Sequence, residues 1–318
     1  MEKVIEIKNL KKYFRSPRGM VHAVDDVTMS IEKGKTMGVV GESGCGKSTL
    51  GRTVIHLLDK TDGQILFNGK DISDPAPKEL KSLRSDLQII FQDPYSSLNP
   101  RMTVEETIQE PLRLIRKMRG NDLEDETDRL MKMVGIDERL RLSYPHELDG
   151  GRRQRVGIAR ALALNPKFIV CDEPVSALDV SIQAQILNLL MDLQEEYGLT
   201  YMFITHNMAV VRHISQDISV MYLGQLVETS PTDELFDRPL HPYTKALLSA
   251  IPTTDILHPQ ERIVLEGEIT SPINPEPGCR FAARCKYATE ACKKPQELEE
   301  ILPNHFVSCC RCREINSI

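Results

Sequence analysis

Short apolar runs separated by polar residues fill the first forty positions of the chain. They predict a series of strands joined by short turns. The predicted strands cover residues 4–10, 22–31 and 35–41, with turns at Pro17–Gly19 and Lys33–Gly34. A glycine-rich loop and a helix follow over residues 41–58. Residues 64–72 then form a strand pair, because the step Asn68–Gly69 is typical of a hairpin turn.

The rest of the chain is first helical and then alternates helices with apolar strands. Residues 103–147 are highly charged and mostly helical in pattern, with Gly120 and Gly135 as breaks. Beyond residue 150 the alternation predicts a parallel sheet with crossover helices. The predicted helices cover residues 152–164, 181–197 and 208–215, and the strands cover residues 167–173, 200–205 and 218–228. From about residue 231 prolines interrupt the pattern, so we expect an accessory region there and not a continuation of the sheet.

Composition narrows the class of protein. The 318 residues carry a formal net charge of −6, which argues against a general nucleic-acid binder. The first residues alternate charged and apolar positions and do not resemble a secretion signal. No apolar run approaches the roughly 18–20 residues that span a bilayer. We therefore expect any role at a membrane to depend on partner proteins.

Six of the eight cysteines crowd the last 40 residues. Without an export signal we expect a reducing compartment, where such a cluster favours a metal or iron–sulfur site over disulfides. The clustered cysteines are Cys279, Cys285, Cys292, Cys309, Cys310 and Cys312.

Residues 41–49 match the pattern G-x-x-x-x-G-K-[ST] between an apolar strand and a helix, which is the context that a phosphate-binding loop requires. Its glycines let backbone N–H groups surround phosphates, Lys47 reaches the β- and γ-phosphate oxygens, and Ser48 is a candidate Mg²⁺ ligand. An ordinary glycine-rich turn is the far weaker alternative. The predicted ATP-binding residues are Gly41, Glu42, Ser43, Gly44, Cys45, Gly46, Lys47, Ser48 and Thr49.

The apolar strand over residues 167–173 ends in two acids. Asp172 would hold Mg²⁺ through water, and Glu173 would orient or deprotonate the attacking water. These two acids could instead only cap the next helix, but the phosphate loop makes that alternative the weaker one.

With these motifs in order, residues 1–250 resemble the ATP-binding subunits of ABC transporters. The resemblance implies that Tyr13 stacks on adenine and that Gln92 senses Mg²⁺ and faces the membrane subunit. It also implies that residues 176–179 contact a second ATPase domain and that His206 contacts the γ-phosphate. The family signature, usually L-S-G-G-Q, falls on Leu148, Asp149, Gly150, Gly151 and Arg152.

Several stretches are similar to the peptide-importer group of this family, which takes up dipeptides and oligopeptides. They are FQDPYSSLNPRMTV, CDEPVSALDVSIQAQILNLL and RPLHPYTKALLSAIP. Importers of nickel and of some other solutes belong to the same group, so the resemblance does not determine the transported solute.

The resemblance also covers the cysteine-rich end, where this group can hold an iron–sulfur cluster. The matching positions are Cys279, Cys285, Cys292 and Cys309, and four thiolates can ligate either [4Fe–4S] or Zn²⁺. Free surface thiols are the alternative. Cys310 and Cys312 exceed the pattern and are expected to be spectators.

The expected fold is an α/β P-loop nucleotide-binding domain over residues 1–230, with an antiparallel β subdomain and a helical subdomain at about 95–160. Residues 231–318 form the cysteine-containing extension. The expected function is ATP hydrolysis that powers solute import from the cytoplasmic face of the membrane. The resemblance implies a second ATPase subunit in a heterodimer, two transmembrane permeases and, indirectly, an extracellular or periplasmic substrate-binding protein. A soluble ABC ATPase acting on DNA or ribosomes, and an iron–sulfur sensor with a vestigial nucleotide site, are the weaker alternatives.

Asp149 replaces the usual serine of the signature. Aspartate and serine cap helices about equally well, so the replacement preserves an N-cap. Serine, however, can donate a hydrogen bond to the γ-phosphate, whereas a carboxylate about 4 Å from one phosphate charge costs roughly 4 kcal/mol at an effective dielectric of 20. Because a signature serves the partner's ATP, the sequence predicts an asymmetric heterodimer in which the composite site containing Asp149 turns over slowly.

Cys45 lies inside the phosphate loop at a helix N-terminus, a setting that favours a reactive thiolate. We expect a maleimide to label it and Mg-ATP to protect it, with a small buried filler as the alternative.

Overall fold

The computed structural model describes residues 2–252, 262–267 and 270–318, and it divides into two compact units. The first unit contains the chain start up to Val4, Glu32–Lys35 and Asp74–Met202. The second contains Ile5–Ile31, Thr36–Ser73 and Phe203–Ile318. None of the helices in the described residues is long and apolar enough to cross a membrane.

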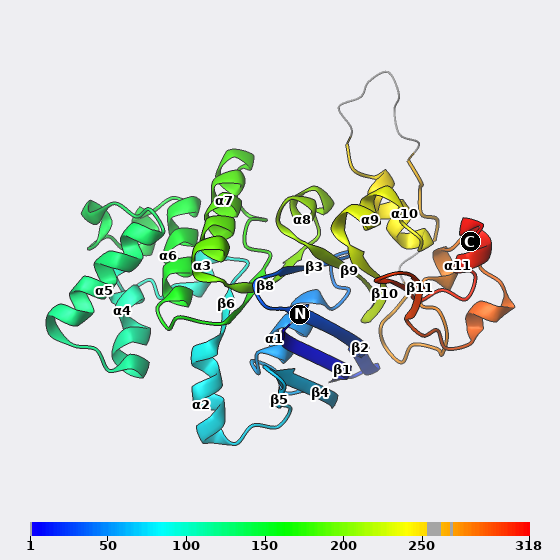
Figure 1. Ribbon diagram of the computed structural model, residues 1–318, viewed down its shortest axis with the longest axis horizontal. Coiled ribbons are helices and arrows are strands. Elements are labelled where there is room, and N and C mark those ends of the chain that lie inside the picture. The colour runs from blue at the N-terminus through cyan, green and yellow to red at the C-terminus, as the bar shows by residue number, and fades with distance from the viewer. Residues whose placement is uncertain (1, 253–261, 268–269) are drawn as a thin grey trace. The chain divides into compact units, whose positions relative to one another are not determined.

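The first unit is mainly helical, and α4 and α6 pack on each other and on α5 (Figure 1). Its core includes Leu123, Leu130 and Ile158, which are at most 5% exposed. The two short strands of this unit, β6 and β7, pair in parallel. β7 belongs to the parallel sheet predicted beyond residue 150, whereas β6 lies outside the predicted strands. Its elements are α2 (Pro77–Asp86), β6 (Leu87–Ile90), α3 (Pro94–Ser97), α4 (Val104–Pro111), η1 (Leu112–Arg116), α5 (Gly120–Met133), η2 (Glu138–Leu140), η3 (Pro145–Glu147), α6 (Gly150–Leu162), β7 (Phe168–Asp172) and α7 (Val180–Tyr197).

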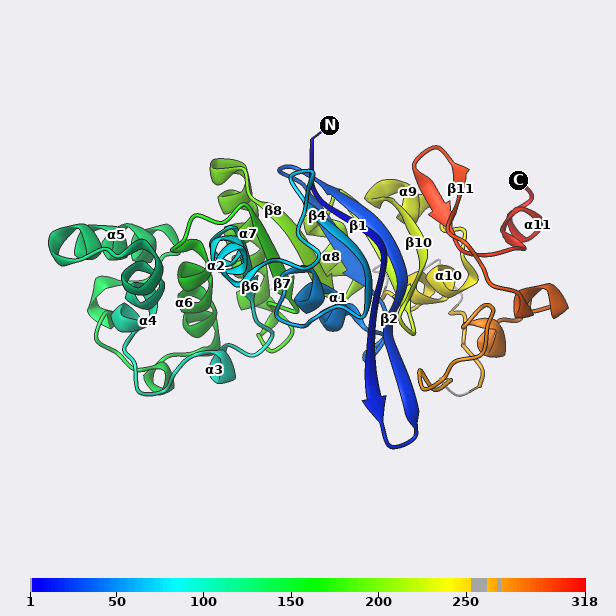
Figure 2. The same cartoon turned by 90° about the horizontal axis from the view of Figure 1, so that it is seen from below.

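The second unit opens with an antiparallel sheet of order β2-β1-β4-β5. Figure 2 shows β1 and β2 as a long hairpin, in agreement with the strands and turns predicted from the sequence. Its first elements are β1 (Lys3–Ser16), β2 (Gly19–Glu32), β3 (Thr36–Val40), α1 (Lys47–Val54), β4 (Asp62–Phe67) and β5 (Lys70–Asp71). β8 (Thr200–Thr205) begins in the first unit and ends in the second.

A second sheet in this unit runs in the order β11-β12-β10-β9-β3. β3 and β9 are parallel, whereas β9, β10, β12 and β11 pair antiparallel. Helix α8 packs against β3 and α9 against β10 (Figure 1). The remaining elements are α8 (Met208–Ile214), β9 (Asp217–Tyr222), β10 (Gln225–Pro231), α9 (Thr232–Asp237), α10 (Pro242–Ser249), η4 (Ala282–Arg284), η5 (Glu290–Lys293), β11 (Glu299–Leu302), β12 (His305–Val307) and α11 (Cys312–Asn316).

The pairing of β12 with β10 corrects one expectation from the sequence. The region beyond residue 231 does continue the sheet, because Val307 and Phe306 lie opposite Glu228 and Thr229. Prolines do interrupt much of this region, but residues 299–307 form a short hairpin that adds to the edge of β10.

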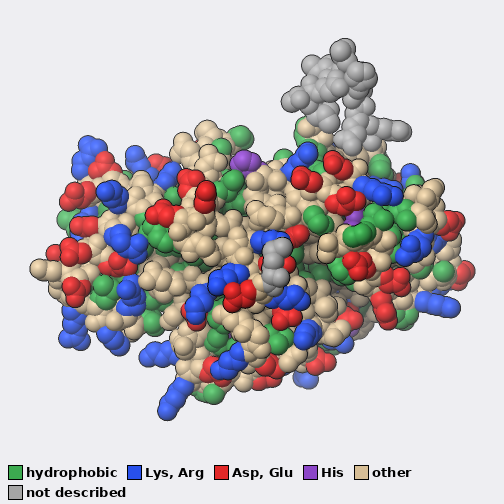
Figure 3. All heavy atoms as spheres, in the orientation of Figure 1, with side chains coloured by type: hydrophobic (Ala, Val, Ile, Leu, Met, Phe, Trp, Pro, Cys, Tyr) green, Lys and Arg blue, Asp and Glu red, His purple; other side chains and the backbone are tan. Residues whose placement is uncertain are grey.

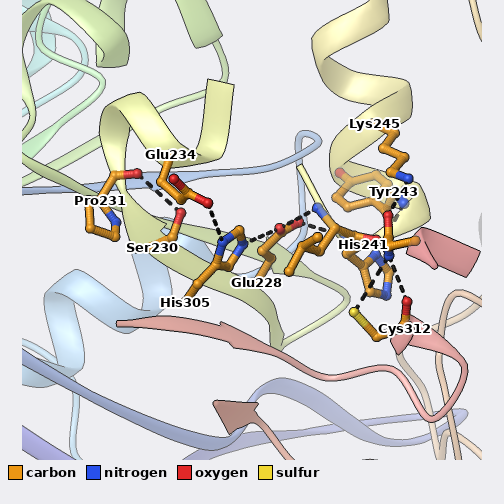
Figure 4. A network of polar contacts seen from close by, with 11 residues as sticks. Glu228, Ser230, Pro231, Glu234, His241, Tyr243, Lys245, His305 and Cys312 are labelled. Carbon is orange, nitrogen blue, oxygen red and sulfur yellow. Dashed lines mark hydrogen bonds and ion pairs between the residues drawn. The ribbon is translucent and has the colours of Figure 1, made fainter. Parts of the chain in front are cut away.

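A buried polar network holds this hairpin in place (Figure 4). His305 Nε2 lies 2.7 Å from Glu228 Oε1, and both side chains are fully buried. Glu228 also accepts hydrogen bonds from the backbone N–H groups of Leu240 and His241, at 2.7 and 3.0 Å. A buried carboxylate is costly without such partners, so this network fixes the C-terminal hairpin to β10 and to the start of α10.

Acidic and basic side chains are interspersed on the face of the molecule drawn in Figure 3. On this face the surface is therefore of mixed charge.

Candidate active site

The phosphate loop runs from the end of β3 to the start of α1 and lies tightly against its surroundings. Gly41 has φ +155°, and a Cβ there would lie 2.1 Å from the carbonyl oxygen of Met221. Gly46 has φ +107°, and a Cβ there would lie 2.0 Å from the carbonyl oxygen of Ala23. Any larger residue would displace the loop, so the predicted glycines are needed at both ends.

Lys47 is the first residue of α1 and is only 4% exposed. Its Nζ donates hydrogen bonds to the carbonyl oxygens of Gly41, at 2.9 Å, and Glu42, at 3.0 Å. The ammonium group is therefore held inside the loop, where a bound phosphate would meet it. Ser48 and Thr49 follow on the first turn of the helix and are partly buried.

Cys45 differs from its prediction. The side chain is 3% exposed, and burial raises the pKa of its thiol above the ordinary value even though Lys47 lies beside it. The prediction of a reactive thiolate is therefore wrong, because desolvation outweighs the helix N-terminus and the lysine. The alternative of a small buried filler describes Cys45 correctly.

Two residues that the motifs do not include support the loop at Glu42. The backbone N–H of Glu42 donates to the hydroxyl of Tyr243 at 2.9 Å. Arg284 Nη1 lies 2.9 and 3.1 Å from the two carboxylate oxygens of Glu42. Sequence reasoning did not assign a role to either residue, although both lie in stretches that resemble the peptide-importer group.

Tyr13, the predicted adenine-stacking residue, is held by polar contacts in the part of the β1–β2 hairpin that lies nearer its turn. Its ring stacks on His22 with centroids 3.9 Å apart, and its hydroxyl donates a hydrogen bond to Asp25. Burial would raise the pKa of Asp25, but hydrogen bonds from Tyr13 and His22 outweigh it and the pKa lies below the ordinary value. The ring is thus fixed in orientation, which a stacking platform requires.

In the first unit, the acids at the end of β7 occupy different environments. Asp172 is fully buried as the last residue of the strand. Glu173 follows with φ +46°, in the left-handed region that few non-glycine residues adopt. Gln92 Nε2 donates a hydrogen bond of 3.0 Å to Glu173 Oε2, so the structure brings together these two predicted catalytic residues.

Asp149 caps helix α6. Its Oδ1 accepts a hydrogen bond of 2.8 Å from the backbone N–H of Arg152, and Arg152 Nε lies 3.4 Å from Oδ2. Gly150 and Gly151 form the first two residues of the helix. The predicted N-cap is confirmed, and the guanidinium of Arg152 offsets part of the charge of the carboxylate.

His206 follows the last residue of β8 and is exposed. The next residue, Asn207, caps helix α8 by accepting from the backbone N–H of Ala209 at 2.9 Å. The histidine is therefore placed at the junction of a buried strand and a capped helix.

Some of the C-terminal cysteines lie close to one another. The backbone N–H of Cys279 donates to the carbonyl of Cys292 at 2.8 Å, and the sulfurs of Cys292 and Cys310 are 3.9 Å apart. Burial raises the pKa of Cys279 to about 11 and that of Cys309 to about 12. Among the residues that the structure describes, no group of three or more His, Cys, Asp or Glu side chains is arranged to hold a metal ion.

Comparison with known proteins defines the class. Residues 24–176 match the family model described as ABC transporter. The dimeric structure of a post-hydrolysis state of the ATP-binding cassette MJ0796 bound to ADP and Pi is similar, with a TM-score of 0.66 and 31% identity over 72% of this chain and 98% of that chain. CbiO1 from Clostridium perfringens, part of the ABC transporter complex CbiONQ, gives a TM-score of 0.67 and 29% identity over 75% of this chain and 92% of that one. The fold is that of an ATP-hydrolysing ABC cassette.

Closer relatives narrow the class. Residues 227–292 match the model of the oligopeptide/dipeptide transporter C-terminal region. The oligopeptide transport ATP-binding protein AppF of Bacillus subtilis is 50% identical over 97% of both chains. The corresponding protein OppF of Escherichia coli is 51% identical over 96% of this chain and 92% of its own length. The chain therefore belongs to the family of ATP-binding subunits of oligopeptide and dipeptide ABC transporters.

Proposed function

We propose that this chain hydrolyses ATP to drive the import of dipeptides and oligopeptides. The observation that carries the proposal is the match of both the ABC cassette and the C-terminal region to peptide transport subunits. We further propose that it works at the cytoplasmic face of the membrane, with two permeases, a substrate-binding protein and a second, different ATPase subunit. Nickel or another small solute is the second candidate.

Lys47 acts on the phosphates of ATP as a point charge held ready inside the loop. The sequence motifs assign Ser48 and Gln92 as Mg²⁺ ligands, and Asp172 would hold the ion through water; these side chains offer oxygen atoms of the kind that Mg²⁺ prefers. When bound, the ion neutralises charge that develops on the phosphates.

Glu173 orients the attacking water and accepts its proton, and the hydrogen bond from Gln92 holds the carboxylate in place. His206 contacts the γ-phosphate. The signature residues Asp149, Gly150 and Gly151 serve the ATP that is bound by the partner ATPase subunit, and closure of the two ATPases on ATP drives the permeases between their states.

The test is transport in proteoliposomes that contain the chain, its permeases and the second ATPase subunit. We expect ATP-dependent uptake of a labelled tripeptide when the substrate-binding protein is present, and no uptake of Ni²⁺. Uptake of Ni²⁺ in place of the peptide would move the solute to the second candidate. ATPase activity without any uptake of either would contradict the importer role.

We also propose that Cys279, Cys285, Cys292 and Cys309 hold a [4Fe–4S] cluster or Zn²⁺. The described side chains do not form a preassembled centre, so metal binding would have to draw the sulfurs together. The hydrogen bond between the backbones of Cys279 and Cys292 supports the proposal, because it already joins two of the four positions.

Metal analysis of anaerobically purified protein tests this second proposal. Four iron per chain, lost in a Cys279→Ser variant, would assign the cluster, whereas one zinc lost in the same variant would assign Zn²⁺. Protein that folds and contains neither metal would reject both.

A further inference from the structure

The loop over residues 279–285 is anchored in the core of the second unit. Phe281 is 2% exposed, and its ring centroid lies 5.3 Å from that of Tyr222. Two arginines flank this anchor. The side chains of Arg280 and Arg284 are only 6% and 9% exposed, so both are directed inward against neighbouring elements.

Arg284 acts on the phosphate loop itself. Its guanidinium reaches both carboxylate oxygens of Glu42, at 2.9 and 3.1 Å. Glu42 stands next to Gly41 in the loop, and an unpaired carboxylate there would oppose the binding of a triphosphate. The ion pair neutralises that charge and, together with the hydrogen bond from Glu42 N–H to Tyr243, fixes the course of the loop.

Arg280 reaches the same loop indirectly, through residues that contact it. It forms an ion pair with Asp25, the residue that accepts the hydrogen bond of Tyr13, and donates to the carbonyl of Leu223. The neighbouring Gly224 N–H donates to the carbonyl of Cys45 at 2.8 Å. The turn between β9 and β10 thus links Arg280 to the phosphate loop.

We propose that Arg280 and Arg284 are positioning residues of the ATP site, so that the loop over residues 279–285 sets the affinity for ATP. Neither arginine belongs to a nucleotide-binding motif. Each acts through another residue, Arg284 through Glu42 and Arg280 through Asp25 and the β9–β10 turn. Because both arginines contact groups around the phosphate loop, we expect them to act on binding and to leave the chemical step unchanged.

ATP binding to the full-length chain tests the proposal directly. We expect Arg284→Ala to raise the Kd for ATP about tenfold, the loss typical of a charge-assisted hydrogen bond. Arg284→Lys should give a smaller increase, because lysine keeps the charge but not the two-pronged geometry. Arg280→Ala should also raise the Kd. In the assembled transporter KM should rise in parallel, while kcat stays within about twofold.

A double variant separates this role from general damage. Because Arg284 acts through Glu42, the variant Arg284→Ala/Glu42→Gln should bind ATP no more weakly than Arg284→Ala alone. Losses that simply add would show that the two residues act independently and would overturn the proposal. If Arg284→Ala fails to fold, the Kd for ATP of Arg284→Lys, of Glu42→Gln and of their double variant is compared in the same way.

Arg313→Ala is the matched control, because Arg313 is an exposed arginine of the same C-terminal region, and its Kd should equal that of the wild type. Wild-type affinity in folded Arg284→Ala and Arg280→Ala, or a fall in kcat at constant KM, would overturn the proposal. Lys47→Ala reports on the site itself. If it too binds ATP normally, the phosphate loop is wrongly assigned and this proposal fails with it.

Discussion

The amide of Gln92 donates a hydrogen bond of 3.0 Å to the carboxylate of Glu173, which itself has a backbone φ of +46°. The side chain of the proposed general base is thus held by a hydrogen bond, and its backbone adopts a conformation that few non-glycine residues adopt. A strained backbone at a candidate catalytic residue is expected where geometry matters more than local stability.

Glu173→Gln should lower ATP hydrolysis by the assembled transporter by about 100-fold or more, because an amide cannot accept a proton from water. ATP binding should persist. Phosphate release and nucleotide binding, measured on one preparation, test the loss of hydrolysis and the retention of binding. Glu195→Gln, which alters an exposed glutamate on α7, is the control and should behave like the wild type. Hydrolysis at the wild-type rate by Glu173→Gln would show that another group is the base.

The two composite ATP sites of a heterodimer should be unequal. Glu173→Gln in this chain should abolish transport-coupled hydrolysis, because the site that it disables faces the partner's signature. The equivalent change in the partner should have the milder effect, because that ATP meets Asp149. Equal losses from the two variants would leave Asp149 with no role beyond capping α6.

The N-cap at Asp149 should contribute to the stability of the chain. Asp149→Ala should destabilise the chain by about 1 kcal/mol, because the N–H of Arg152 loses its acceptor, whereas Asp149→Ser should be nearly neutral. Hydrogen exchange of the first turn of α6 measures the difference locally. Equal protection of that turn in both variants would contradict the capping role.

His241 should make stability depend on pH. Burial lowers its pKa to about 4 from the ordinary 6.5, so between these values the unfolded chain binds more protons than the folded one. Stability contributed by neutral His241 is therefore fully present above pH 6.5 and is lost as the pH falls toward 4, by up to roughly 3 kcal/mol.

The variant His241→Asn tests this dependence, because asparagine also caps a helix but does not titrate. The melting temperature of the wild type minus that of His241→Asn should be larger at pH 7.5 than at pH 5.0. A difference that is the same at both pH values would show that His241 is not the group responsible.

Cys45 should resist thiol reagents. In the folded chain at pH 7.5 a maleimide should modify it at least about tenfold more slowly than in denatured chain, because a buried thiol reacts only when the structure opens. Mass spectrometry of the peptide that contains Cys45 gives both rates. Fast labelling of the folded protein would show that Cys45 is a reactive thiolate, as the sequence predicts.

The features predicted correctly from the sequence are those that neighbouring residues determine. The phosphate loop follows from glycines beside a strand end, and the cap at Asp149 follows from the chemistry of one side chain. Tyr243 and Arg284 support Glu42 across 201 and 242 positions of chain, and no local pattern encodes such contacts. The same holds for Cys45, whose burial depends on elements far away in the sequence, and for β12, whose partner β10 precedes it by several elements.

The C-terminal hairpin has a consequence for solubility. β12 covers the hydrogen-bonding edge of β10, and the outer strand, β11, is short and begins with the exposed Glu299 and Glu300. Short, charged outer strands discourage pairing between molecules, whereas a bare edge invites it. A chain that ended before residue 299 would expose β10 and deprive Glu228 of His305. We therefore expect the hairpin to protect the ABC domain from aggregation, independently of any bound metal or nucleotide.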